Sequence, residues 1–304
     1  MVASRAKPGQ LSARVMHGYV IFDNNAYKRI TGGRLDRIIA AERENNIIPL
    51  ANIAVLQELL ARARDVEPEQ RGRNRAAIRK LGQHCRSTRN GRTVINFLGH
   101  LESQVYRLFT GEVAPGDTQL FDHLGDVVRV VTEAGNDDPL LAISEELDLF
   151  EQNVASIENE YVTRLKEAPR SDIQPNQMKR NLDYAHSAVA RTQEFYRCRF
   201  SPEDIMLSMI DLAKLTSIGF MLRDSVVEEV RMKGGGHAQH RNTVWDEEVV
   251  SSTSIYTTVA GKSVLVVTEE VRLLAVAAQV KAADHVCDIA TYEKMLGLPI
   301  WPST

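Results

Sequence analysis

The chain has 304 residues, of which 43% are hydrophobic and 25% are charged, and its formal net charge is −3. This composition supplies the core of one large domain or two small ones and excludes wholesale disorder. The small net charge argues against a global basic field for nucleic acid, although a local basic patch is compatible with it. Three widely spaced cysteines argue against a disulfide framework, and no apolar stretch approaches the ~18 residues of a membrane span. We therefore expect a soluble cytoplasmic protein.

The N-terminal part alternates short apolar runs with helical patterns. VIFD, at 20–23, is typical of a buried strand, and its final acid either marks a functional edge or closes a simple Asx turn. Apolar residues at helical spacing predict a helix over 34–46. IIPL, at 47–50, predicts a second strand, and Asn52 is suited to cap the helix that follows.

A basic stretch comes next, because residues 71–101 contain no acidic side chain. Apolar residues among the cations predict that part of this stretch is an amphipathic helix with a basic outer face. Cationic side chains bind phosphate without distinguishing bases, so six of them are candidates for contacts to a nucleic-acid backbone: Arg71, Arg75, Arg79, Lys80, Arg86 and Arg89. The same face could be solvated, or it could pair with the acidic helix at 145–160.

The middle of the chain, roughly 95–200, is mostly helical by its pattern. Apolar residues recur every three or four positions from Ile143 to Leu165, which is an a/d-like seam of about three heptads. Such a seam suits an amphipathic helix in an intramolecular bundle, which we favour, or an intermolecular coiled coil. The segment is therefore also the candidate surface for a protein partner or a homo-oligomer.

The C-terminal part returns to alternating strands and helices. Ser201 precedes Pro202 and two acids, which is typical of a helix start. A helix is expected from about Asp246, a strand over 264–267, and then a helix, a short strand and a last helix. Short apolar strands separated by helices predict an α/β fold, with a parallel β-sheet and flanking helices.

Acidic residues gather where such a fold places function. Asp23 ends the first strand, Glu269 and Glu270 follow the strand at 264–267, Glu58 lies in an apolar helix stripe, and Asp246 begins a helix. Ligands of parallel sheets collect at the carboxyl ends of the strands. Clustered carboxylates need a cation, and their hard oxygens suit Mg²⁺ or Mn²⁺, which can activate water and stabilise a phosphoryl transition state.

Two further acids compete for one place in this cluster. Asp204 and Asp211 flank the helix that follows Ser201, and either could be the third acid in place of Asp246.

The order of these motifs resembles the PIN-domain nuclease superfamily. The family has a strand ending in Asp, a later helix with Glu, an acid opening a late helix, and a strand ending in Thr-x-Asp. The matching segments are VIFD with Asp23, IIPLANIAVLQELLARARD with Glu58, WDEEVV with Asp246, and VLVVTEEVRLLAVAA with Glu270. The closing HVCDIATYEKMLGL is also similar to the family's last strand and helix. The resemblance covers about 18–85 and 243–298.

The resemblance implies a PIN-like domain formed by 17–94 and 201–304, interrupted by a helical insertion at 95–200. It also implies a metal-dependent endoribonuclease whose four carboxylates, Asp23, Glu58, Asp246 and Glu270, hold Mg²⁺ or Mn²⁺ and act on RNA. Two departures stand out: Glu270 occupies the position of the family's Asp, and the insertion is large. Both favour the alternative of an inactive scaffold that binds protein or RNA, and a structure-specific DNA nuclease is the other alternative.

Overall fold

The computed structural model describes residues 18–89, 92–133, 143–167, 177–233, 240–279 and 285–299. Within these ranges the central sheet has the strand order β2-β1-β7-β8, and every neighbouring pair is parallel. The strands are β2 (Ile48–Pro49), β1 (Tyr19–Phe22), β7 (Val264–Val267) and β8 (Val286–Cys287). The α/β class with a parallel sheet is thus confirmed.

The register of β1 against β7 decides where the first acids lie. Phe22 pairs with Val267, so both strands end at the same edge of the sheet. All four residues of β7 are buried, as are Val20, Ile21 and Phe22 of β1, because helices cover both faces of a parallel sheet. The segments at 20–23 and 264–270, more than 240 positions apart in the chain, therefore meet.

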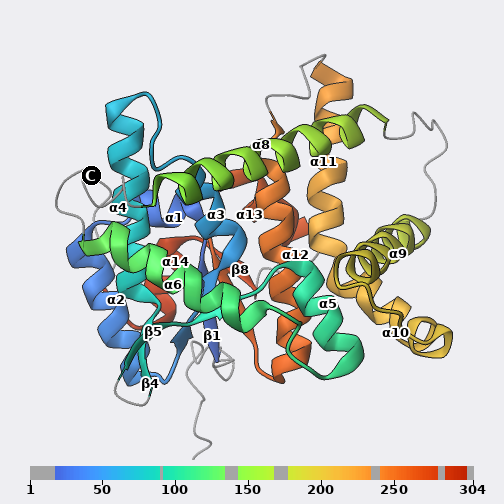
Figure 1. Cartoon of the computed structure of the whole chain (residues 1–304), viewed down its shortest axis with the longest axis horizontal. Coiled ribbons are helices and arrows are strands. Elements are labelled where there is room, and N and C mark those ends of the chain that lie inside the picture. The colour runs from blue at the N-terminus through green and yellow to red at the C-terminus, as the bar shows by residue number, and fades with distance from the viewer. Residues whose placement is uncertain are drawn as a thin grey trace, which may run out of the picture.

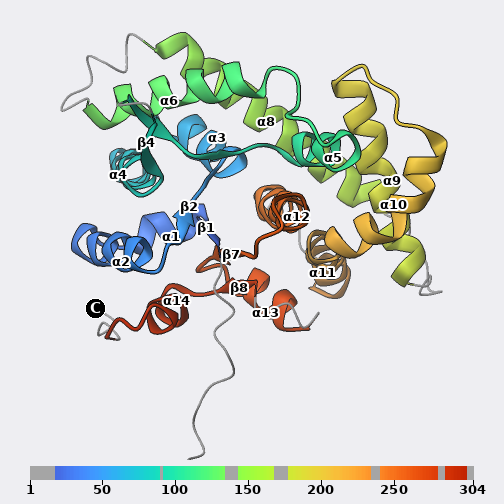
Figure 2. The same ribbon diagram turned by 90° about the horizontal axis from the view of Figure 1, so that it is seen from below.

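Helices flank this sheet on both sides, with α2 and α14 on one side and α12 on the other (Figure 2). The helices of this part are α1 (Asn24–Arg29), α2 (Gly32–Glu44), α3 (Ile53–Ala61), α4 (Pro68–His84), α12 (Thr243–Ala260), α13 (Val271–Gln279) and α14 (Ile289–Met295). Asn52 caps α3 as expected, since its Oδ1 accepts a hydrogen bond of 2.9 Å from the Ala54 N–H.

The basic stretch forms both a helix and strands. After α4, the chain forms the antiparallel pair β4 (Arg86–Arg89) and β5 (Arg92–Ile95), and β6 (Phe97–Leu98) pairs in parallel with β3 (Ala51–Asn52). Arg86 and Arg89 therefore lie on a strand, whereas Arg71, Arg75 and Arg79 lie on α4. The sequence between the two strands, Asn90-Gly91, is typical of a hairpin turn, whereas helical spacing of apolar residues predicts no strand here.

The remaining helices form a layer over this core and a group beside it (Figure 1). They are α5 (Leu101–Thr110), α6 (Asp117–Glu133), α8 (Ser144–Glu167), α9 (Gln177–Phe195), α10 (Pro202–Leu215) and α11 (Ser217–Lys233). The apolar seam on α8 is buried within this one chain at Leu147, Phe150 and Val154, where it joins the main core. This burial agrees with the intramolecular alternative for this helix, and a partner or homo-oligomer through the segment stays a prediction. The domain boundaries at 95 and 200 stay a prediction.

In the part of the chain that the structure describes, no single helix is long and apolar enough to cross a membrane. Taken together, α10 and α11 satisfy the criteria of length and composition, but they bend by 57° at their break.

Candidate active site

Asp23 stands at the junction between β1 and α1. It is buried, with 3% of its surface exposed, and its Oδ1 accepts a hydrogen bond of 2.6 Å from the Ala26 N–H. This contact makes Asp23 the N-cap of α1, so the strand leads directly into a helix instead of ending in an isolated Asx turn. Its second oxygen, Oδ2, accepts a hydrogen bond from the Thr268 hydroxyl.

Thr268 and Glu270 form the neighbouring wall, at the end of β7. The Thr268 Oγ1 accepts a hydrogen bond of 2.9 Å from the Glu270 N–H, which ties this segment to Asp23. Glu270 lies on the same side, and its Oε2 accepts a hydrogen bond of 3.4 Å from Asn25. Glu269 faces elsewhere, because its carboxylate pairs with Arg29 at 3.3 Å and accepts the N–H of a residue in α14.

Three consecutive acids at the start of α12 point in three directions. Asp246 is partly exposed and lies near the other predicted acids, whose charges all raise its pKa. Glu247 is buried and accepts a hydrogen bond of 3.1 Å from Arg223, whereas Glu248 accepts one of 2.5 Å from the Leu101 N–H. Successive side chains on an α-helix are rotated by about 100°, so these three carboxylates meet different neighbours. Asp246 is thus the acid of this run that belongs to the cluster.

Glu58 comes from the second turn of α3 and has a cationic neighbour. It is buried, and its Oε1 lies 3.0 Å from Arg62 Nη1, one helical turn further on. Arg62 also lies 3.1 Å from Glu158 Oε1 on α8, which in turn accepts a hydrogen bond of 3.0 Å from the Trp245 indole. The helix α8 of the expected insertion therefore contacts the wall of the candidate site.

The neighbouring carboxylates raise the pKa of two of these acids, Asp23 and Asp246. Burial raises the pKa of Asp23 to about 7, against the hydrogen bonds from Thr268 and Ala26, and the charges of Glu58 and Glu270 raise it further. Burial also raises the pKa of Glu58, although Arg62 opposes this effect. The pKa of Asp246 is raised well above its usual value, first because the surrounding residues partly desolvate its carboxylate and then because of the other three carboxylates.

Sequence reasoning missed two cations at this cluster. Lys28, on α1, is partly buried, and burial lowers its pKa while the charges of Glu58 and Asp23 raise it. Arg62 is the second, and its spacing of four residues from Glu58 was the available signal for that ion pair. Lys28 had no such signal, because its proximity to Glu58 depends on how α1 packs against α3.

Whether the cluster suits a divalent ion follows from its donor atoms. Among the residues that the structure describes, no three His, Cys, Asp or Glu side chains are grouped so as to hold one ion as they stand. Mg²⁺, however, is usually held by one or two carboxylates and keeps several waters. The cluster offers only oxygen donors from its acids, and beside them Asn24 Oδ1 is buried without a hydrogen-bond partner in the described structure. This donor set fits Mg²⁺ or Mn²⁺.

The basic stretch does not present all its charges in the same way. Arg75 Nε donates a hydrogen bond of 2.9 Å to the Ala63 carbonyl, and Lys80 Nζ donates one of 3.0 Å to the Tyr27 carbonyl at the end of α1. These two cations therefore help to dock α4 against the core. Arg79 and Arg86 are exposed, and Arg71 is partly exposed. The side chain of Arg89 lies outside what the structure describes.

The alternative third acids lie on α10 and have local partners. Asp204 follows the Ser201 cap, with its N–H 3.0 Å from Ser201 Oγ, and Asp211 pairs with Lys214 at 3.1 Å. Each of these acids is exposed. Asp246, in contrast, lies close enough to Asp23, Glu58 and Glu270 for all three charges to raise its pKa, so the structure favours Asp246 over both.

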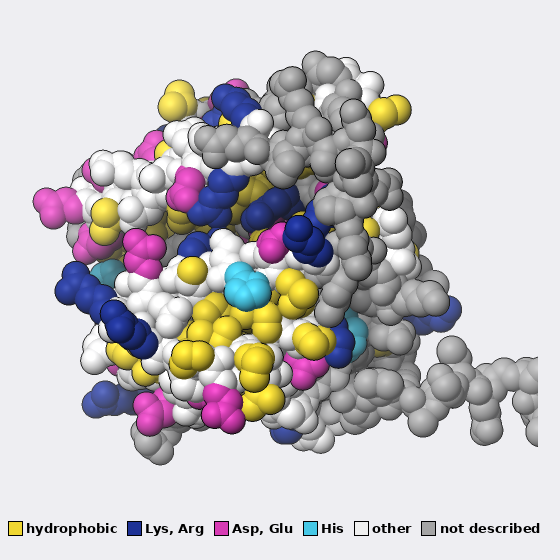
Figure 3. All heavy atoms as spheres, turned by 90° about the vertical axis from the view of Figure 1, so that its right-hand side faces the viewer, with side chains coloured by type: hydrophobic (Ala, Val, Ile, Leu, Met, Phe, Trp, Pro, Cys, Tyr) yellow, Lys and Arg dark blue, Asp and Glu magenta, His cyan; other side chains and the backbone are white. Residues whose placement is uncertain are grey.

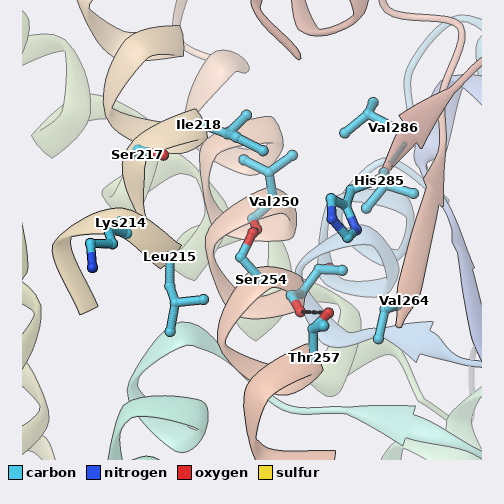
Figure 4. Close-up of a pocket in the computed structure, with 12 residues that line it drawn as sticks. Lys214, Leu215, Ser217, Ile218, Val250, Ser254, Thr257, Val264, His285 and Val286 are labelled. Carbon is cyan, nitrogen blue, oxygen red and sulfur yellow. Dashed lines mark hydrogen bonds between the residues drawn. The ribbon is translucent and has the colours of Figure 1, made fainter. Parts of the chain in front are cut away.

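A cavity of about 200 Å³ lies away from these carboxylates, between α12, the β7–β8 side of the sheet, and the junction of α10 and α11 (Figure 4). Its walls are mainly apolar, with Val250, Val264 and Val286 among them, and His285 and Lys214 add polar groups. None of the four predicted acids lines it. It is therefore a feature separate from the candidate active site.

Comparisons of this chain with protein-family models, with curated proteins and with solved structures find no match.

Proposed function

We propose that the chain is a metal-dependent nuclease that hydrolyses phosphodiester bonds in RNA. The observation that carries the proposal is the convergence of four carboxylates from four separate elements. Glu58 and Glu270 lie close enough to raise the pKa of Asp23, and all three raise the pKa of Asp246. A fold keeps such repulsion where a cation offsets it, and oxygen donors suit Mg²⁺ or Mn²⁺. The choice of RNA over DNA follows the resemblance to PIN-domain nucleases.

Asp23, Asp246 and Glu270 would hold the ion, with Glu58 as a fourth ligand or as a group that acts through water. When bound, a divalent ion supplies a Lewis acid for the scissile phosphate and lowers the pKa of water. The Thr268 hydroxyl fixes the orientation of Asp23, and the Glu270 N–H fixes that hydroxyl in turn. Such support matters because ligands must be held within a fraction of an ångström.

Positive charges beside the acids would receive the substrate. Lys28 and Arg62 both lie close to Glu58, and they are also close enough to each other for their charges to interact. A phosphate that enters the site would pair with these cations, and they would oppose its repulsion from the carboxylates. Exposed Arg79 and Arg86 would contact the backbone further along the strand, without sequence preference.

A non-catalytic scaffold is the second candidate, and one observation favours it. The Arg62 guanidinium already pairs with Glu58 at 3.0 Å, which neutralises one of the four acids without an added ion. In that case the cluster would be a structural ion-pair network, and Glu270 would have no metal to hold.

A cleavage assay separates these functions. Labelled single-stranded RNA, single-stranded DNA and duplex DNA would each be incubated with the purified full chain, in Mn²⁺ and in EDTA. The proposal expects RNA cleavage in Mn²⁺ that EDTA abolishes. Preferential cleavage of DNA would favour the DNA nuclease, and the absence of cleavage, with RNA still bound, would favour the scaffold.

A further inference from the structure

The helix α10 exposes an apolar stripe on its outer side. Met206, Leu207 and Ile210 are exposed to 70%, 68% and 51% respectively. The opposite side of the helix is buried in a core with α5 and α9, through Met209 and Leu212. Figure 3 shows hydrophobic side chains gathered on this face of the molecule, which carries α9 and α10. Single exposed apolar residues are ordinary, but a group on one helix face indicates an interaction surface.

Charges at the two ends of this stripe complement each other. Glu203 precedes Leu207 by four residues, Ile210 follows three later, and Lys214 follows four after that. Spacings of four, three and four keep these side chains on one helix face, like the a and d positions of a coiled coil. Glu203 and Lys214 are both exposed. On this helix face, Leu207 and Ile210 of the stripe are thus flanked by an acid at one end and a base at the other.

This order is self-complementary when two copies of the helix lie antiparallel. A two-fold axis between positions 208 and 209 places Leu207 opposite Ile210 of the other copy, and Glu203 opposite its Lys214. The symmetry repeats each contact twice, which is the property of an isologous interface. Lys214 also pairs with Asp211 at 3.1 Å within one chain, so in the dimer its ammonium would lie between Asp211 and Glu203 of the other copy.

We infer that α10 is the contact surface for a second copy of this chain, which forms an antiparallel two-fold dimer. The surface lies beyond the 95–200 segment and contains none of the four acids of the candidate site. The dimer needs neither metal nor nucleic acid, so its success or failure is independent of the proposed function.

Sedimentation velocity of the full chain, over a range of concentrations in EDTA, tests this inference. Wild type is expected to dimerise, and the double substitution Leu207→Ser with Ile210→Ser is expected to give a folded monomer. Met232→Ser is the matched control, because Met232 is 73% exposed on α11, outside the stripe. A monomeric wild type at every concentration, or a dimer that survives the double substitution, would overturn the inference.

A charge swap tests the antiparallel register itself. Glu203→Lys should raise the dimer dissociation constant about tenfold, because two attractive contacts become repulsive at once. Adding Lys214→Glu to the same chain should restore wild-type affinity, since opposite charges then face each other again. If the double swap dimerises no better than Glu203→Lys alone, the register is wrong. Binding of a monomeric wild type to anionic lipid vesicles, lost in the serine variant, would instead assign the stripe to a membrane surface.

Discussion

Replacing Asp23 with Asn should make the metal-free protein more stable at neutral pH, although it removes the central acid of the site. The Asp23 pKa rises from 3.8 to about 7 on folding, chiefly because the carboxylate is buried. A difference of this size corresponds to about 4 kcal/mol against the charged form. Asn is as good an N-cap as Asp, so the hydrogen bond with Ala26 should survive the change.

The sign of the pH dependence follows from the raised pKa. Below pH 3.8 the carboxyl is protonated in both the folded and the unfolded chain, and the substitution has no electrostatic effect. As the pH rises from about 4 to 7, the unfolded chain loses this proton first, so the wild type becomes progressively less stable. From these two pKa values, the advantage of Asp23→Asn should grow by about 2 to 3 kcal/mol between pH 5 and pH 8.

Urea unfolding in EDTA, followed by tryptophan fluorescence at both pH values, measures this advantage. If Asp23→Asn loses the hydrogen bond with Thr268, the cost in unfolding free energy is the same at both pH values. The difference between the two measurements therefore reports only the electrostatic effect. Asp211→Asn is the control for general effects of charge, because Asp211 is 73% exposed. An Asp23→Asn advantage that does not change with pH, or a variant less stable than wild type at pH 8, would refute the electrostatic description of the site.

Three further substitutions test separate parts of the account. Glu270→Gln should lower the rate of cleavage in Mn²⁺ about 100-fold. Glu269→Gln should have little effect, because Glu269 faces Arg29. Equal losses of initial rate in the two variants would contradict the assignment of Glu270 to the site. Glu158→Gln should weaken Mn²⁺ binding about tenfold in calorimetry, since Arg62 would then pair with Glu58 alone. An unchanged Mn²⁺ affinity would show that Glu158, and with it α8, has no influence on the metal site. Alanine at both Arg79 and Arg86 should reduce the slope of log RNA affinity against log salt by about two, and an unchanged slope would exclude them from the interface.

Much of the sheet edge could be predicted from the sequence. Strands that end in acids, in an alternating α/β pattern, predict that Asp23 and Glu270 share one edge of the sheet, and the parallel pairing of Phe22 with Val267 places them there. The start of α12 was expected at about Asp246, but the helix begins three residues earlier, at Thr243. Helix ends are uncertain by a few residues because several positions there are compatible with a cap.

The rest of the site depends on contacts that no local pattern encodes. Arg62 and Glu158 are 96 positions apart, and they meet only because α8 packs over α3. Lys28 reaches the cluster through the packing of α1, and Lys80 turns back to a carbonyl of α1 instead of facing solvent. A charged residue on a helix can be exposed, paired or docked, and its sequence position alone does not distinguish these states.

The central claim is that Asp23 and its neighbouring carboxylates hold a divalent ion for phosphodiester hydrolysis. Titration calorimetry with Mn²⁺, on metal-free wild type and on Asp23→Asn, tests it most directly. We predict saturable binding to wild type, with a rise in melting temperature as Mn²⁺ is added, and neither effect in the variant. Wild type that binds no Mn²⁺, or a variant that binds it with wild-type affinity, would contradict the claim.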